Sequence, residues 1–164
     1  MAETGSRRMK TTWILVADDA RARLFAATPA STTFTELGCF TNPEGRAGTR
    51  KLTTHRPPTV NESVGNARHA IEPHVTLREK VADRFARELG DVLARGHAER
   101  RYDHLMLVAP PRFLGALHGN LDKPLRDVVS CEVRRDFTAL PSAQIRARLS
   151  AKLPQRAQRR EGRT

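Results

Sequence analysis

The stretch YDHLMLVAPPRFLGAL, residues 102–117, carries the clearest fold signal in the chain. Leu105–Ala109 is a short unbroken apolar run, which is typical of a strand buried on both of its faces. Pro110 and Pro111 end this strand, because proline cannot donate to a strand ladder but suits the first turn of a helix. Apolar residues then recur at helical spacing before a glycine that is expected to follow the helix: Phe113, Leu114 and Leu117, then Gly119. The stretch therefore predicts a strand, a tight turn and a helix, which is half of a βαβ unit.

A long amphipathic helix is predicted before this strand. Thr76 is its expected N-cap, because Glu79 stands three residues later and the two side chains form a capping box. The apolar stripe of this helix comprises Leu77, Val81, Phe85, Leu89, Val92 and Leu93. The charged residues expected to face away from it are Arg84, Arg87, Glu88, Asp91 and Arg95. Gly96 is predicted to end the helix.

Further elements are predicted toward both ends of the chain. The N-terminal strands are Thr12–Ala17, Ala22–Ala27 and Thr33–Phe40. They form an antiparallel meander, and the imperfect alternation of the third strand indicates a sheet edge. Toward the C-terminus, we expect a helical turn or two in Asp122–Val128, a half-exposed strand over Val129–Val133, and a last helix entered at Pro141.

The predicted fold class is α/β, with a single domain over residues 11–153. Its mixed sheet has about five strands, an antiparallel meander followed by βα units, with flanking helices. Residues 1–10 are expected to be a flexible N-terminus, and residues 154–164 a basic disordered tail.

The formal charge of +11 is concentrated near the C-terminus. Residues 141–164 contain seven Arg or Lys and one acidic residue, whereas residues 102–140 balance five bases against five acids. A basic tail of this kind can bind RNA, DNA or an anionic membrane surface, and it can also simply aid solubility.

The cysteines and the N-terminal residues are typical of a cytoplasmic protein. Cys39 and Cys131 lie in apolar, strand-like contexts without metal-binding spacing, so both are expected to be reduced core residues. They could form a disulfide only if their strands were neighbours. The apolar run Trp13–Ala17 is too short for a signal peptide, and no segment approaches transmembrane length.

Residues 41–75 are predicted to be a long loop, because Asn42–Val75 shows no periodicity and is rich in Gly, Pro, Thr, Asn and Arg. Loops of this length are usually functional or disordered. Its candidate nucleic-acid-binding residues are Arg46, Arg50, Lys51, His55, Arg56, Arg68 and His69. Three glutamates reduce the net charge of the segment to +2, and no aromatic residue is present to stack a base. A solvated flexible loop is therefore the alternative to a phosphate-binding surface.

Asp18 and Asp19 follow a buried strand, which is a common place for metal-binding carboxylates in α/β folds. Adjacent side chains on a strand point to opposite faces, so both could ligate one ion only if the chain bends there. Asp103 and Asp136 are the distant partners available for such a site. The alternative is an ordinary turn, in which aspartate is favoured.

The histidines lack HExxH, HxxxH or HxH spacing and no glycine-rich nucleotide motif is present, so no metal site, cofactor or catalytic residue is predicted.

Six segments together resemble a known family. In order they are TWILVADDARARLF, NPEGR, RHAIEP, FARELGDVL, LMLVAPPRFLGAL and RRDFTALPSAQIRARL. They extend from about residue 12 to residue 150 and resemble the bacterial host attachment protein family. The family name implies a role in the attachment of bacteria to host cells, which is a phenotype and leaves the biochemical activity open.

This family in turn is similar to the middle domain of archaeal and eukaryotic class-1 peptide release factors. The similarity implies a mixed sheet with flanking helices, and a Gly-Gly-Gln loop between a strand and a long helix that enters the ribosomal peptidyl-transferase centre. The corresponding stretch here is SVGNARH, residues 63–69, in which Val64 replaces one glycine and Asn66 the glutamine. Peptidyl-tRNA hydrolysis is therefore not expected. Binding to a ribosome, tRNA or other structured RNA is still expected.

Three functions are compatible with these observations. The first is a non-enzymatic module that contacts ribosomes or structured RNA through the basic loop and tail. The second is an adhesion-related protein that contacts a host-cell or surface component. The third is a metal-dependent hydrolase that uses Asp18 or Asp19.

Overall fold

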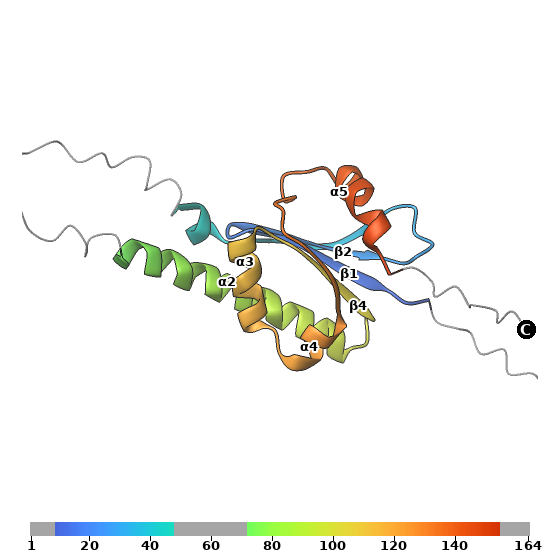
Figure 1. The fold of residues 1–164 in the computed structure, drawn as a ribbon, viewed down its shortest axis with the longest axis horizontal. Helices are drawn as coiled ribbons and strands as arrows, with labels where there is room; N and C mark the ends of the chain where they lie inside the picture. The colour runs from blue at the N-terminus through green and yellow to red at the C-terminus, as the bar shows by residue number, and fades with distance from the viewer. Residues whose placement is uncertain (1–8, 48–71, 155–164) are drawn as a thin grey trace, which may run out of the picture.

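The computed structural model describes residues 9–47 and 72–154, which form one five-stranded sheet with helices on both faces (Figure 1). In chain order the strands are β1 Thr12–Ala17, β2 Arg21–Ala27, β3 Thr35–Thr41, β4 His104–Val108 and β5 Val129–Val133. Their spatial order is β3-β2-β1-β4-β5, so β3 and β5 are the edges. β2 runs antiparallel to β1 and β3, whereas β4 runs parallel to β1 and β5. The predicted α/β class, the meander and its edge strand are confirmed.

The helices form two layers of unequal size (Figure 1). One face of the sheet is covered by α2 Glu72–Ala98, α3 Pro111–Asn120 and α4 Lys123–Val128. The other face is covered by α5 Ser142–Leu149 and the 3-10 turn η1 Ser150–Lys152. Among residues 9–47 and 72–154, none of the helices has the length and apolarity needed to span a bilayer.

β1 and β4 form the centre of the sheet and are buried on both faces. Every residue of β1 is buried, and Leu105–Val108 of β4 have no exposed surface. Alternate residues serve the two cores: Trp13 and Leu15 pack on the α2 side, and Ile14 and Val16 pack on the α5 side. The unbroken apolar runs in the sequence therefore reflect two covered faces.

α2 begins earlier than predicted. It starts at Glu72, so Thr76 lies inside the helix and the predicted capping box is wrong. Pro73 accounts for the earlier start, because proline is preset for the first helical turn. Leu77 is 62% exposed instead of belonging to the apolar stripe. The 27-residue helix is about 40 Å long, roughly twice the length of a six-residue strand, so its first turns extend past the sheet (Figure 1).

The rest of the α2 pattern holds. Phe85, Leu89 and Leu93 are buried, and Val81 and Val92 are partly buried. The five charged residues expected on the opposite side are all exposed.

Two glycines lie inside helices instead of ending them. A Cβ atom at Gly96 would lie 2.2 Å from the Trp13 ring, so this glycine lets α2 pack directly on β1 and the helix continues to Ala98. Gly119 lies within α3, which ends one residue later at Asn120. The Asn120 side chain donates to the carboxylate of Asp83 in α2 at 2.7 Å, which secures the last turn of α3.

The prediction that both cysteines are core residues is wrong. Cys39 is exposed on β3 and Cys131 is half-buried on β5, and both thiols are free. β3 and β5 are the two edge strands, and their burial patterns show that one face of each is open to solvent.

Replacing Gly96 by alanine should lower the free energy of unfolding by about 1–3 kcal/mol, because the methyl group would overlap the Trp13 ring. Gly115 in α3 is a matched control, since a Cβ atom there meets nothing within 4 Å. Gly115→Ala should raise stability by about 0.5–1 kcal/mol through helix propensity. Urea unfolding followed by circular dichroism measures both changes, and equal effects would contradict the packing of α2 on β1.

Candidate functional site

The predicted phosphate-binding cations can be placed only in part. Six of the seven lie outside the described residues: Arg50, Lys51, His55, Arg56, Arg68 and His69. Arg46 is exposed on a short helix over residues 43–47. This helix and the early start of α2 at Glu72 correct the predicted loop 41–75, whose two ends are helical. The predicted tail lies outside the described residues from position 155 onward.

The carboxyl ends of β1, β3, β4 and β5 lie along the same end of the sheet. We call this end the carboxyl edge, as distinct from the edge strands β3 and β5. In open α/β sheets this is the edge where ligands bind. Asn42 ties the end of β3 to the β1–β2 turn, because its backbone N–H donates to Ala20 at 2.7 Å and its side-chain amide donates to the Asp19 carbonyl at 2.8 Å. From α2, the Arg78 guanidinium contacts the Asp19 carboxylate at 3.0 Å. The described chain on each side of residues 48–71 is therefore anchored at this edge.

The helix over residues 43–47 is held at the same edge by close packing and by an ion pair. A Cβ atom at Gly45 would lie 2.0 Å from the Asp19 carbonyl oxygen, so only glycine fits there without displacing the turn. Glu44 accepts a hydrogen bond from Arg84 of α2 at 2.5 Å. The NPEGR segment therefore serves, at these positions, to seat the chain against β1 and α2.

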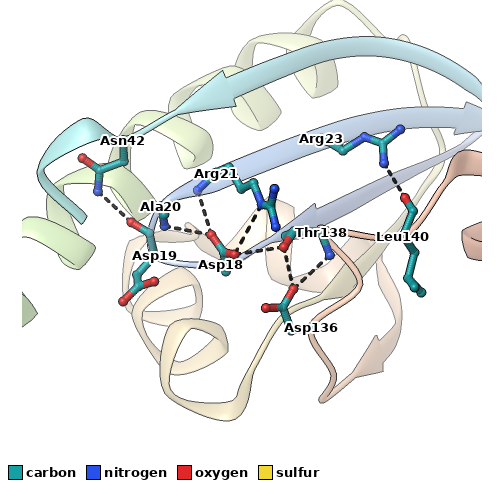
Figure 2. Close-up of polar contacts among 9 residues, drawn as sticks. All are labelled: Asp18, Asp19, Ala20, Arg21, Arg23, Asn42, Asp136, Thr138 and Leu140. Carbon is teal, nitrogen blue, oxygen red and sulfur yellow. Dashed lines mark hydrogen bonds and ion pairs between the residues drawn. The ribbon is translucent and has the colours of Figure 1, made fainter. Parts of the chain in front are cut away.

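Asp18 connects the β1–β2 turn to the loop that follows β5 (Figure 2). One of its carboxylate oxygens accepts the backbone N–H groups of Ala20 at 2.8 Å and Arg21 at 2.7 Å. The other oxygen accepts the Thr138 hydroxyl at 2.9 Å, across 120 positions of sequence. Asp18 therefore acts as a turn residue, which was the alternative to a metal ligand.

Asp136 and Thr138 complete this cluster (Figure 2). The Thr138 backbone N–H donates to Asp136 Oδ1 at 2.9 Å, and Thr138 Oγ1 lies 2.6 Å from the same oxygen. Because a hydroxyl carries a single proton, Thr138 donates to Asp136 or to Asp18 at any moment. Thr138 is only 3% exposed, so the two carboxylates are bridged from inside the protein.

These carboxylates do not form a metal site within the described ranges. Asp19 points to Arg78, away from the Asp18 cluster. Asp103, the other expected partner, lies at the opposite end of the strands, next to the start of β4, where it accepts the Thr11 backbone N–H at 2.8 Å. In residues 9–47 and 72–154, no three His, Cys, Asp or Glu side chains are placed to hold a metal ion.

A cavity of about 240 Å³ opens at the carboxyl edge between α2 and α3. Its polar lining consists of four carboxylates and two arginines: Asp18, Asp19, Glu79 and Asp136, with Arg78 and Arg112. Both guanidiniums are already paired, Arg78 with Asp19 at 3.0 Å and Arg112 with Glu79 at 3.1 Å. The excess of negative charge disfavours phosphate, so this cavity is not the anion site that the sequence suggests.

Arg23 on β2 holds the α5 layer on the sheet. Its guanidinium donates to the Leu140 carbonyl at 2.7 Å (Figure 2). A second bond, of 2.8 Å, reaches Ser142 Oγ at the start of α5. Arg23 also donates two hydrogen bonds to Glu36 on β3, at 3.1 and 3.0 Å. The hydrogen bonds from Arg23 lower the pKa of Glu36, and those to Glu36 raise the pKa of Arg23.

The residues that organise this edge include several that the sequence did not single out. The bonds of Thr138 to Asp18 and of Arg23 to Leu140 have no spacing signal, because each joins residues more than a hundred positions apart. Gly45 and Arg78 could have been suspected, since a glycine and an arginine in a polar segment often mark close packing and carboxylate pairing.

Comparison with known proteins gives a matching family model and solved structures with a similar fold. A family model described as "Protein required for attachment to host cells" matches residues 13–149. No curated protein matches the chain. Among solved structures, the archaeal translation termination factor aRF1 is similar, with a TM-score of 0.52 and 12% identity over 87% of this chain and 35% of that chain. A second structure, titled "Archaeal protein", has a TM-score of 0.42 and 13% identity, with the same coverage. The chain spans about a third of the length of aRF1, and the likeness shows a common fold alone.

Asp18→Ala should lower the free energy of unfolding by about 1–3 kcal/mol, because two backbone N–H groups lose their acceptor. Its neighbour is the control: the Asp19 carboxylate makes a half-exposed ion pair with Arg78, so Asp19→Ala should cost less than about 1 kcal/mol. Urea unfolding compares the two variants. A larger loss for Asp19→Ala would contradict the role of Asp18 in the turn.

Glu36→Gln should destabilise the protein near neutral pH and have little effect in acid. Because the pKa of Glu36 is lowered by folding, the contribution of its pair with Arg23 is complete above the unfolded pKa of 4.5 and is lost as the pH falls through the folded pKa. The loss is expected to stay below about 1 kcal/mol, since the side chain is 39% exposed. Thermal unfolding at pH values of about 7 and about 3 measures it. Glu88→Gln, on the exposed side of α2, is the control, and a Glu36→Gln effect independent of pH would contradict the pairing.

Proposed function

The chain belongs to the family of proteins required for attachment to host cells, and we propose that its biochemical activity is to bind structured RNA, such as tRNA or the ribosome, in the cytoplasm. In this proposal it acts as a binding module and not as an enzyme. The contact residues are the cations of the segment between β3 and α2: Arg46, Arg50, Lys51, His55, Arg56, Arg68 and His69. The basic residues after position 154 assist by charge.

The distribution of charge is the observation that carries this proposal. The described residues contain 19 Lys and Arg against 15 Asp and Glu, whereas the other 42 residues contain 10 against 3. Most of the formal charge of +11 therefore belongs to residues 1–8, 48–71 and 155–164. Such a cationic excess favours phosphate, which arginine binds both by Coulomb attraction and by paired hydrogen bonds.

The position of the segment also supports RNA binding. It joins the body between a strand, β3, and a long helix, α2. The release-factor resemblance implies a ribosome-contacting loop between the same kinds of element, and the likeness to a translation termination factor is consistent with it. Val64 and Asn66 stand where that resemblance expects glycine and glutamine, so we propose binding without hydrolysis.

The family description favours a second candidate, an adhesion-related protein that itself contacts the host cell. The two candidates differ in where the protein acts. Fractionation of the producing cells, with an antibody to the native protein, separates them: the RNA-binding proposal predicts sedimentation with ribosomes, and direct adhesion predicts recovery at the cell surface.

The full chain should bind tRNA and purified ribosomes in a filter assay, and its affinity should fall steeply with salt because bound cations are released from the phosphates. Replacing Arg50, Lys51, Arg56 and Arg68 by glutamine should weaken binding and reduce the salt slope by about 3. A control variant removes the same charge from ion-paired residues: Arg84, Arg87, Arg112 and Lys123. Absence of binding at low salt would overturn the proposal, and equal losses in both variants would move the contact away from this segment.

A further inference from the structure

We propose, resting on the RNA-binding function above, that the α5 layer is a second docking surface for the RNA phosphate backbone, separate from the segment between β3 and α2. The surface is defined by five cations of the loop after β5, of α5 and of η1. These α5-layer cations are Arg134, Arg135, Arg146, Arg148 and Lys152.

The net charge of the described body comes entirely from this layer. Residues 134–154 contain these five cations and one acid, Asp136, which gives +4. The remaining described residues, 9–47 and 72–133, balance 14 bases against 14 acids. The described residues outside 134–154 are therefore neutral overall, and residues 134–154 carry the net positive charge.

The two sides also differ in how their cations are paired. On the α2 side, five cations have carboxylate partners at 2.5–3.2 Å: Arg78, Arg84, Arg87, Arg112 and Lys123. Within the described chain, no ion pair is made by any of the α5-layer cations. Asp136, the acid nearest to them in sequence, accepts hydrogen bonds from Thr138 instead. Arg146 Nε is buried without a hydrogen-bond partner among the described residues.

One of the α5 cations contacts the loop that follows β5. The Arg148 guanidinium lies over the Phe137 ring, 5.3 Å from its centroid, and Phe137 is two residues beyond Arg135. Arg134, Arg135 and Arg148 are all exposed. Phe137 and α5, which carries Arg148, lie on the opposite side of the sheet from α2 (Figure 1).

The chemistry of this surface fits a phosphate backbone better than a membrane or a base. The large apolar residues exposed in the described chain are Met9, Leu37 and Leu77, and none belongs to the α5 layer, so it lacks the apolar anchors of a membrane-inserting surface. Phe137 is only 9% exposed and offers no free ring for base stacking. Contacts limited to phosphates position an RNA without reading its sequence.

The test compares the wild type and three variants of the whole chain in filter binding to tRNA across a salt series. In the first variant, Arg134, Arg135 and Arg148 are replaced by glutamine; in the control, Arg84, Arg87 and Arg112 are. Each phosphate contact raises the binding affinity about fivefold at 0.1 M salt relative to 1 M. The α5-layer variant, which lacks three contacts, should therefore bind about a hundredfold more weakly, and the slope of log affinity against log salt should fall by about 2. The control should stay close to the wild type. The double variant Arg134→Gln/Arg135→Gln leaves the Arg148–Phe137 contact intact and should still lose about 25-fold.

The outcomes separate this inference from the function on which it rests. If the wild type binds tRNA and the α5-layer variants bind no worse than the control, the docking surface is overturned and the RNA-binding function stands. If the wild type does not bind tRNA even at low salt, both are overturned. Vesicles of phosphatidylcholine and phosphatidylserine provide the last arm: binding to these vesicles that depends on the α5-layer cations, without binding to tRNA, would identify a membrane surface instead.

Discussion

The parallel pairing of β1 with β4 is the constraint on which the rest of the structure depends. Trp13 lies opposite Leu105 and Val16 opposite Val108, at the centre of a sheet with two strands on one side and one on the other. Because both strands are apolar on both faces, each face needs a covering layer. α2, α3 and α4 supply one layer and α5 the other. The same pairing places the carboxyl ends of β1 and β4 side by side, which is where the polar cluster around Asp18 forms.

The strands were predictable because their signal is local. An apolar run such as Leu105–Ala109, ended by two prolines, has one stable interpretation in a domain of this size. The errors arise where a partner distant in sequence overrides a local rule. Gly96 is a good helix terminator in isolation, but the Trp13 ring occupies the space a side chain would need, and the helix continues. Leu77 matches the helical period yet lies beyond the end of the sheet, where no strand of the described chain covers it.

The polar edge was predictable only in outline. The sequence places Asp18 directly after a buried strand, and the preference of aspartate for turns correctly predicts its bonds to the backbone of the β1–β2 turn. Thr138 could not be found, because a threonine 120 positions away gives no periodic or spacing signal. The same holds for Arg23, whose bonds to the start of α5 depend on which face of the sheet the last helix covers.

The charges of the two helical layers have different physical roles. On the α2 side, ion pairs join separate elements: Arg78 contacts the β1–β2 turn, and Arg112 of α3 contacts Glu79 of α2. The α5 layer is attached in another way, by burial of Ile145 and Leu149 and by Arg23, which donates to neutral oxygens of the layer. Its own arginines are not needed to hold it in place by ion pairs. A small layer that is fixed by apolar contacts and a neighbour's guanidinium can therefore keep cations that have no carboxylate partner among the described residues, and this is the property that the proposed RNA docking surface requires.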